Sequence, residues 1–463
     1  MPIRSPSKSG RTTHSGVDRR NFLRIGGLGA GGLLLPELLR QRASAAPTAR
    51  PSADGFGRAK SCILLFMGGG PSQLATFDLK PDAPAEVRGD FKPIATDVPG
   101  IQISDHLPLL SRQAHKYAVV RSVTDEYVGG AHGQSVYLAL TGHRSPRVPG
   151  DDVRPSPEDY PCLGSVVSRF GPAVQTMPAF VWLLEMYRHT FAGEGGGLLG
   201  KRHDPFRVLQ DPSRPNFEVQ ALRPPMEIPL DRLDQRRVLL DNISKSSDSR
   251  LRSAATGTMG THYGQVFDLM SSPRFHKAFD LKTEPERLRE RYGKTKFGQG
   301  TLLARRLVEH GVPLVTVYWN GPDPSNWDTH YEETKHLKVL LPPTDAAFSA
   351  LLDDLQSRGM LDETLVVWMG EFGRAPRIEE KGGRGHWGRC YSAVFAGGGV
   401  KGGQVLGKSD RFAAYPAANP VGPADLVATI YHALGIESDI EVNDHLGRPI
   451  KLCLGSAVRP LFS

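Results

Sequence analysis

The sequence has little cysteine, with four in 463 residues. Cys62, Cys162, Cys390 and Cys453 stand far apart and form no CxxC pair, which excludes a cysteine-rich metal cluster and a dense disulfide framework. We expect buried free thiols, because two of the four lie in the apolar runs SCILLFM and RCYSAVFA. The alternative is a single disulfide, formed in an oxidising compartment, and the sequence does not indicate which two cysteines would pair.

The chain also lacks an apolar run long enough to span a bilayer, which takes about 20 residues. The apolar stretch 25–35 is shorter and follows the pair Arg19–Arg20 in DRRNFLRIGG. The small residues ASA at 43–45 form a cleavage site of the kind that ends a signal peptide. This N-terminus resembles a twin-arginine export signal, with an ordinary amphipathic helix as the alternative.

These features predict the organisation of the chain. We expect an export signal over 1–45, a linker rich in Pro, Ala, Ser and Gly over 46–58, and one α/β domain over 59–463. The mature protein would be periplasmic or extracellular, with no transmembrane span after signal removal.

An excess of positive charge is absent from the main body of the chain. The formal net charge of +8 falls to about +2 once the +6 of residues 1–45 is set aside. A near-neutral body gives no general reason to bind nucleic acid, so we predict no nucleic-acid partner.

Apolar runs alternate with helical patterns along the body. Runs of strand length cover 61–67, 116–123, 177–184 and 312–319, and TLVVWMG and YSAVFAGGG add two more. Helical patterns cover 132–143, 231–256, 284–310, 342–359 and PADLVATIYHALG, with the first ending at Gly142 and the fourth starting at Pro342. The alternation predicts an α/β fold with a doubly wound, mostly parallel sheet and an irregular insertion around 200–260.

Polar residues collect in the loops that follow the expected strands. Parallel strands end at one edge of a sheet, where ligands bind, so these side chains would meet there. In chain order they are Ser72, Asp78, Asp125, His132, Ser135, Asn320, Asp328, His330, Glu371, Arg374 and His386. Carboxylates and imidazoles gathered in one place suit zinc, manganese or calcium.

Each candidate also has a purely structural interpretation. Asp328 and His330 share one face if WDTH is extended, although Asp is also a common turn residue. Glu371 is either a metal ligand or the ion-pair partner of Arg374. His386 is either a ligand or a surface histidine on a flexible loop.

Two glycine-rich stretches flank these candidates. His132 could cap the helix that it opens, but the glycines of GGAHG indicate that something approaches closely there. Gly68–Gly70 could hold an anion with backbone N–H groups. They match neither GxGxxG nor a P-loop, so a nucleotide site is not favoured.

Several longer motifs resemble one family. FMGGGPSQLATFDLKP, LTGH, GEGGGLLGKRHDPF, WDTH, GEFGRAPRI, GRGHW and AGGGVKGGQVLGKSD together are similar to the domain-of-unknown-function family 1501 over about residues 60–460. This resemblance implies a sulfatase-like fold of the alkaline phosphatase superfamily. The motifs are specific for the family and give no substrate.

The resemblance also shows where this chain departs from sulfatases. HGQSVYLALTG fits the frame that holds their C-x-P-S-R motif, with Ser135 on the serine and His132 where the nucleophile-forming cysteine stands. The formylglycine mechanism is therefore excluded. Gly69 and Gly70 stand near the place of an Asp pair. In GEFG the acid persists as Glu371, but Phe372 replaces a ligand.

What remains implies a different metal site. By resemblance to phosphatases of the superfamily, Asp328, His330 and His386 would hold one ion with an open position for water. Arg374 would steady negative charge, and His132 would serve as base, acid, nucleophile or fourth ligand. We therefore predict the catalytic residues His132, Arg374 and Ser135, and the metal ligands Asp328, His330, Glu371 and His386.

Three functions are compatible with these residues. The first is an exported metal-dependent hydrolase of sulfate or phosphate esters, with a small-molecule or glycan ester as substrate. The second is a catalytically degenerate protein that binds a carbohydrate or a partner, and the third is a scaffold at the cell envelope. Metal content separates the first from the other two, and glycan binding without turnover separates the second from the third.

Overall fold

The structure is a computed structural model that describes residues 54–125, 130–147, 154–172, 177–185, 192–219, 272–322 and 324–463. The export signal expected at 1–45 and the helix expected at 231–256 lie outside these residues, as do most of the linker and of the insertion. The described residues all belong to one unit, Pro51–Ser463.

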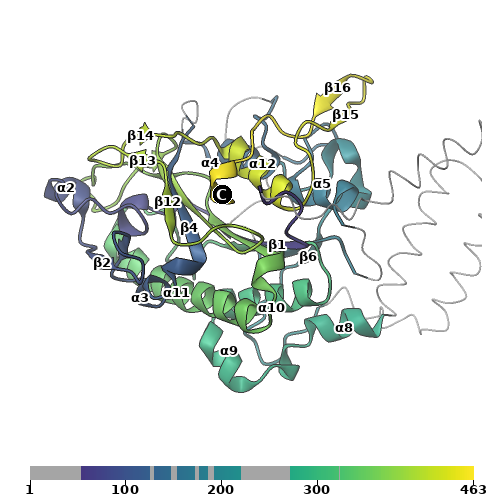
Figure 1. Cartoon of the computed structure of the whole chain (residues 1–463), viewed down its shortest axis with the longest axis horizontal. Coiled ribbons are helices and arrows are strands. Elements are labelled where there is room, and N and C mark those ends of the chain that lie inside the picture. The colour runs from purple at the N-terminus through teal and green to yellow at the C-terminus, as the bar shows by residue number, and fades with distance from the viewer. Residues whose placement is uncertain are drawn as a thin grey trace, which may run out of the picture. The chain divides into compact units, whose positions relative to one another are not determined.

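A central sheet of eight strands organises this unit (Figure 1). In chain order the strands are β1 (Ser61–Met67), β4 (Tyr117–Val123), β5 (Phe180–Leu183), β6 (Phe206–Val208), β7 (Leu314–Trp319), β8 (Thr364–Met369), β11 (Tyr391–Ala396) and β12 (Gln404–Leu406). They lie in the order β12-β4-β11-β8-β1-β7-β5-β6. Each neighbouring pair is parallel except the two that include β11. The predicted α/β class with a mostly parallel sheet is confirmed.

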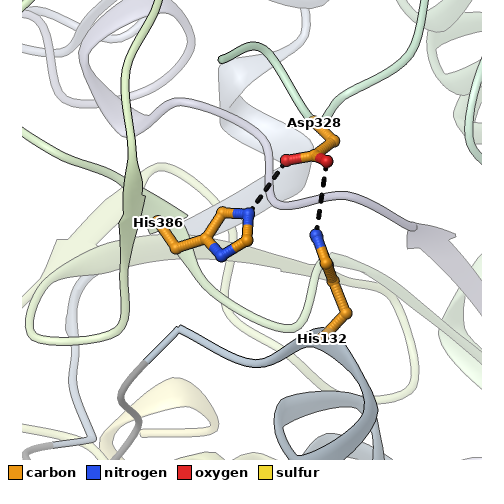
Figure 2. A group of neighbouring side chains, drawn as sticks. All are labelled: His132, Asp328 and His386. Carbon is orange, nitrogen blue, oxygen red and sulfur yellow. Dashed lines mark hydrogen bonds and ion pairs between the residues drawn. The ribbon is translucent and has the colours of Figure 1, made fainter. Parts of the chain in front are cut away.

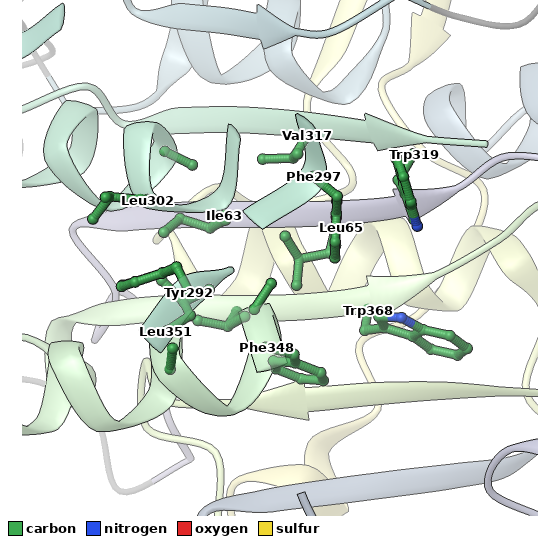
Figure 3. Close-up of a cluster of buried hydrophobic side chains, with 14 of the residues drawn as sticks. Ile63, Leu65, Tyr292, Phe297, Leu302, Val317, Trp319, Phe348, Leu351 and Trp368 are labelled. Carbon is green, nitrogen blue, oxygen red and sulfur yellow. The ribbon is translucent and has the colours of Figure 1, made fainter. Parts of the chain in front are cut away.

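Helices cover both faces of the sheet. Ile63, Leu65 and Met67 of β1 face one core, which α8 (Pro273–Phe279), α9 (Glu286–Tyr292), α10 (Lys296–Glu309) and α11 (Glu333–Ser357) complete (Figure 3). Cys62, Leu64 and Phe66 face a second core with α4 (His132–Thr141), α5 (Leu163–Phe170) and α12 (Pro423–Ala433). Successive strand residues point to opposite faces, so a fully apolar run such as β1 requires cover on both sides.

Shorter elements surround the sheet. The helices α2 (Ala85–Arg88) and α3 (Pro108–Ser111) precede β4. Four two-stranded ladders pair β2 (Pro93–Ala95) with β3 (Gln102–Ser104), β9 (Gly373–Arg374) with β10 (His386–Trp387), β13 (Lys408–Ser409) with β14 (Pro416–Ala418), and β15 (Glu441–Asn443) with β16 (Pro449–Lys451).

Helix α4 ends as expected, whereas other predicted elements differ from the structure. Gly142 caps α4 in the left-handed conformation with φ +71°, which glycine adopts without steric cost. Helix α11 begins at Glu333 and continues through Pro342 and Pro343, so the start predicted at Pro342 is wrong. The expected helix at 284–310 is two helices, and β6 places part of the expected insertion in the sheet.

The cysteines agree with one further expectation. All four cysteines are buried free thiols. Across the described ranges, no helix has both the length and the apolar character needed to cross a membrane.

Candidate metal centre

Loops that follow the parallel strands β4, β7 and β8 bring the side chains of His132, Asp328 and His386 together (Figure 2). His132 is the first residue of α4, which follows β4. Asp328 lies in the loop after β7, and Glu371 lies two residues after β8. His386 comes from β10, which pairs with β9 so that His386 stands opposite Arg374. The parallel sheet therefore brings segments 130–132, 328–330 and 371–386 to one edge.

Asp328 uses both carboxylate oxygens in this cluster. Its Oδ2 lies 3.4 Å from Nε2 of His132, and its Oδ1 lies 3.0 Å from Nε2 of His386 (Figure 2). One ligand atom from each of the three side chains lies within 4.8 Å of the other two. All three side chains are partly exposed, so solvent or a small ligand reaches the cluster.

The outer nitrogens of both imidazoles are anchored to acceptors. Nδ1 of His386 donates to the backbone carbonyl of Gly130. Nδ1 of His132 donates to Oε1 of Glu371 at 2.8 Å, and this oxygen also accepts the Gly69 N–H at 2.8 Å. Because these partners accept, the proton of each neutral imidazole belongs on Nδ1, and each Nε2 presents a lone pair to Asp328.

Lone pairs that face a carboxylate repel it unless positive charge lies between them. That charge is either a metal ion or a proton on an imidazole. Ligating histidines commonly donate the other ring N–H to a carboxylate or a backbone carbonyl, which is the arrangement of His132 and His386 here. The cluster therefore has both the inner atoms and the outer anchors of a metal site.

The separations also fit an ion. Metal–nitrogen and metal–oxygen distances near 2.0 Å place two tetrahedral ligand atoms about 3.3 Å apart, close to the 3.4 Å between Oδ2 of Asp328 and Nε2 of His132. His386 faces the other carboxylate oxygen, Oδ1, at 3.0 Å. Three protein ligands leave one position open for water or substrate. Two imidazoles and one carboxylate suit zinc better than calcium, which prefers six to eight oxygen ligands.

The charges of the cluster are strongly coupled. Burial alone would raise the pKa of Asp328, but hydrogen bonds with His132 and His386 and the charge of Arg374 hold it well below its ordinary value. Burial alone would lower the pKa of His132, but its hydrogen bonds to Asp328 and Glu371 outweigh this and raise the pKa to about 10. Without an ion, His132 is therefore an imidazolium at neutral pH, paired with two carboxylates.

The sequence matches the family described as "Protein of unknown function (DUF1501)" over residues 59–462. The chain belongs to the DUF1501 family. The resemblance noted from the motifs is therefore confirmed over nearly the whole described chain. A comparison with curated proteins gives no match.

Several solved structures are similar to this DUF1501 chain at low identity. Ps i-CgsB in complex with k-i-k-neocarrahexaose is 14% identical, with TM-score 0.41 over 87% of this chain and 76% of its own. The PsFucS1 sulfatase from Pseudoalteromonas sp. is 13% identical, with TM-score 0.38 over 83% and 69%. A protein in the alkaline phosphatase superfamily from Vibrio parahaemolyticus is 9% identical, with TM-score 0.37 over 82% and 67%. Likeness at this level gives no activity for the DUF1501 chain.

His132, predicted as base, acid, nucleophile or fourth ligand, lies among the candidate ligands. Glu371, predicted as a ligand, lies behind His132. His330 is beside the cluster, with its Nε2 2.8 Å from Nε2 of His386 and 3.1 Å from Oδ1 of Asp328. Its side chain is more exposed than those of the other two histidines, so it faces the solvent side.

Arg374 lies behind the cluster rather than facing solvent. Its side chain is 0% exposed, and Nη2 donates to Oδ1 of Asp328 at 2.6 Å. The remaining guanidinium N–H groups donate to the carbonyls of Gly69, Gly70 and Arg384. Arg374 therefore fixes Asp328 and cannot reach a substrate without rearrangement. Glu371 is not the hydrogen-bonded partner of Arg374 in this arrangement.

Ser135 is turned away from the cluster. It is buried in α4, and its hydroxyl donates to the carbonyl of Ala131 at 2.8 Å. Serine in a helix often makes this bond to the preceding turn. The catalytic role predicted for Ser135 by resemblance has no geometric support here.

The glycine signals in the sequence have specific causes in the DUF1501 structure. A Cβ on Gly130 would lie 2.9 Å from Cβ of His386, so the close approach indicated by GGAHG is that of His386. The Gly68–Gly70 stretch does bind an anion through the Gly69 N–H, and this anion is the Glu371 carboxylate of the chain itself. The carbonyl of Gly130 and the N–H of Gly69 are backbone groups, which residue types alone do not reveal.

Proposed function

We propose that this DUF1501 protein is an exported metal-dependent hydrolase of sulfate or phosphate esters, acting on a small-molecule or glycan ester. One observation carries the proposal. His132 and His386 are each anchored through Nδ1, and their Nε2 atoms converge with Asp328 at a solvent-accessible edge of the sheet.

The chain's own residues have separable tasks in this proposal. A divalent ion bound by His132, Asp328 and His386 would lower the pKa of water and polarise an ester oxygen. Glu371 orients His132, and Arg374 orients Asp328. The N-terminus of α4 begins at His132 and adds a partial positive charge that favours an anionic ester.

Water is the proposed nucleophile, because no side-chain nucleophile is in place. His132 stands where sulfatases carry the nucleophile-forming cysteine, and the Ser135 hydroxyl is used within α4. His330, which is partly exposed beside the cluster, is placed to exchange a proton with solvent.

A second candidate is a catalytically degenerate protein that binds a carbohydrate or a partner. It is favoured by the charge balance of the cluster without metal. A protonated His132 and Arg374 together offset Asp328 and Glu371, and both nitrogens of His132 already face carboxylate oxygens. In that case the cluster is a partly buried salt-bridge network and no ion is needed.

Metal content separates the two candidates. Elemental mass spectrometry on protein purified at pH 8 without an affinity metal is expected to find stoichiometric metal, zinc before manganese or calcium. The pH is set high because an ion must displace the proton from His132. An Asp328→Ala/His386→Ala variant is expected to lose the metal and any turnover of sulfate and phosphate esters.

The matched control removes the same two residue types outside the cluster. Asp439 and His445 are both exposed, so Asp439→Ala/His445→Ala is expected to retain the metal. A folded wild-type protein that contains no metal and gains none from added zinc would refute the hydrolase and leave the binding protein.

Export remains a proposal that rests on the N-terminal sequence alone. Arg19 and Arg20 precede a short apolar stretch and a small-residue cleavage site. Fractionation of producing cells is expected to find the protein outside the cytoplasm, and cytoplasmic retention of the wild type would contradict this.

A further inference from the structure

The number of ions at the centre can be inferred from what surrounds Asp328. Its two oxygens face different histidines, so Asp328 could in principle bridge two ions about 3.5–4 Å apart, as carboxylates do in two-metal sites. A second ion would need room on a flank of Asp328, further ligands, and the absence of a competing positive charge.

Arg374 supplies the competing charge on one flank. Its guanidinium is always protonated, and the four hydrogen bonds described above hold it in place with no exposed surface. The single ion would therefore bind Asp328 through Oδ2, and a second ion on Oδ1 would lie within about 5 Å of the guanidinium nitrogen. Repulsion at that distance is weakly screened in a buried site.

Phe372 packs hydrocarbon against both imidazoles of the centre. Its side chain is 0% exposed, and its ring centroid lies 5.0 Å from that of His132 and 4.6 Å from that of His386. A Cβ on Gly70 would lie only 2.4 Å from the Phe372 ring, so the ring fills the space up to the β1 loop. An aromatic ring offers a metal ion no lone pair here.

Few donor atoms nearby are left for a separate second ion. Oε1 of Glu371 accepts from His132 and Gly69, which leaves only Oε2 without a partner. Within the described ranges, His132, Asp328 and His386 are the group whose ligand atoms lie within 4.8 Å of one another. Nε2 of His330 lies 2.8 Å from Nε2 of His386 and 3.1 Å from Oδ1 of Asp328, so His330 would extend this same group and does not start a separate one.

We infer that the centre holds one metal ion and excludes a second, because Arg374 occupies Oδ1 of Asp328 and Phe372 fills the space beside the imidazoles of His132 and His386. This inference rests on the proposed function, since it presupposes that one ion binds. It makes Phe372 a specificity-determining residue that sets the metal stoichiometry.

Counting bound zinc tests the inference without an activity assay. The full chain is saturated with zinc and dialysed, and metal per chain is measured by elemental and native mass spectrometry. The value of an Asp328→Ala variant is subtracted as the background of other sites. We expect one ion in the wild type and in Phe372→Leu, which keeps the flank apolar.

A ligand at position 372 is expected to raise the count. Phe372→His keeps a ring of similar shape and adds a nitrogen, and it should bind two ions per chain. Phe372→Asp is a second, smaller variant in case the first does not keep the wild-type circular dichroism spectrum. A folded variant of either kind that still binds one ion overturns the role of Phe372.

The wild-type count distinguishes failure of the inference from failure of the proposed function. Two ions in the wild type, both lost in Asp328→Ala, overturn the one-ion inference and leave a metal-dependent protein. No ion in the wild type overturns both. One ion that is lost in Asp328→Ala supports both.

Discussion

Replacing Arg374 by methionine is expected to lower the free energy of unfolding by about 3–5 kcal/mol, the typical cost of removing one partner of a buried ion pair. The methionine fills much of the volume but donates no hydrogen bond. Three backbone carbonyls and Oδ1 of Asp328 would lose their donor. Urea unfolding followed by circular dichroism measures the change.

A matched control separates the effect of losing a buried arginine from the effect of losing a positive charge at the surface. Arg377 lies on the same loop with its side chain 78% exposed, in a loose pair with Glu86. Surface substitutions of this kind change stability by about 0.5 kcal/mol or less, so Arg377→Met should be nearly neutral. A loss in Arg374→Met no larger than that of Arg377→Met would contradict the buried role.

The coupling between Arg374 and Asp328 can be measured separately. In a double-mutant cycle, Asp328→Asn should cost less in the Arg374→Met background than in the wild type, because its charged partner is already gone. If the two losses simply add, Arg374 acts through the backbone carbonyls and does not position Asp328.

The sheet was predictable from sequence because a doubly covered strand has a simple signature. Ser61–Met67 and Leu314–Trp319 are almost uninterrupted apolar runs, and both were expected as buried strands. Edge elements are harder to predict, since β6 and β12 have three residues each and no periodic pattern. The start of α11 was missed because Pro342 and Pro343 fit a first turn better than a helix interior.

The location of the candidate site was predictable for a related reason. The loops that follow parallel strands begin at the same edge of the sheet, so the sequence alone predicts that Asp328, Glu371 and His386 lie close together. Their individual roles depend on angles and on backbone atoms that the sequence does not specify. Glu371 follows a strand as a ligand would, yet its carboxylate turns toward His132 and Gly69. The burial of Arg374 depends on the paths of three loops.

The glycines in the loops around the candidate site allow close packing between neighbouring loops. Gly69 lies against the backbone of Asp328, Gly70 against Phe372, and Gly130 against His386. In each case a Cβ would clash with the neighbouring loop. Within the loop Met369–Gly388, a Cβ on Gly373 would lie 2.4 Å from Gln73 and one on Gly383 would lie 2.1 Å from His330, so this loop is also closely packed.

Replacing Glu371 by glutamine is expected to weaken metal binding about 10- to 100-fold while leaving the site intact, as loss of an outer partner of a ligating histidine typically does. Glutamine keeps an oxygen that can accept from Nδ1 of His132 and from the Gly69 N–H. It removes the negative charge that makes His132 a better donor to an ion. Competition for zinc with a fluorescent chelator at pH 8 gives the change in Kd.

The size of the change in the zinc Kd shows whether Glu371 binds the ion directly or only orients His132. If Glu371 bound the ion directly, Glu371→Gln should weaken binding about as severely as Asp328→Ala. If it only orients His132, the loss should be intermediate, and His132→Ala should make Glu371→Gln nearly silent. Glu380→Gln is the control, since it removes the same charge from an exposed position on the same loop and should leave Kd unchanged. An unchanged Kd in Glu371→Gln would mean that the bond between Glu371 and His132 is structural and does not contribute to metal binding.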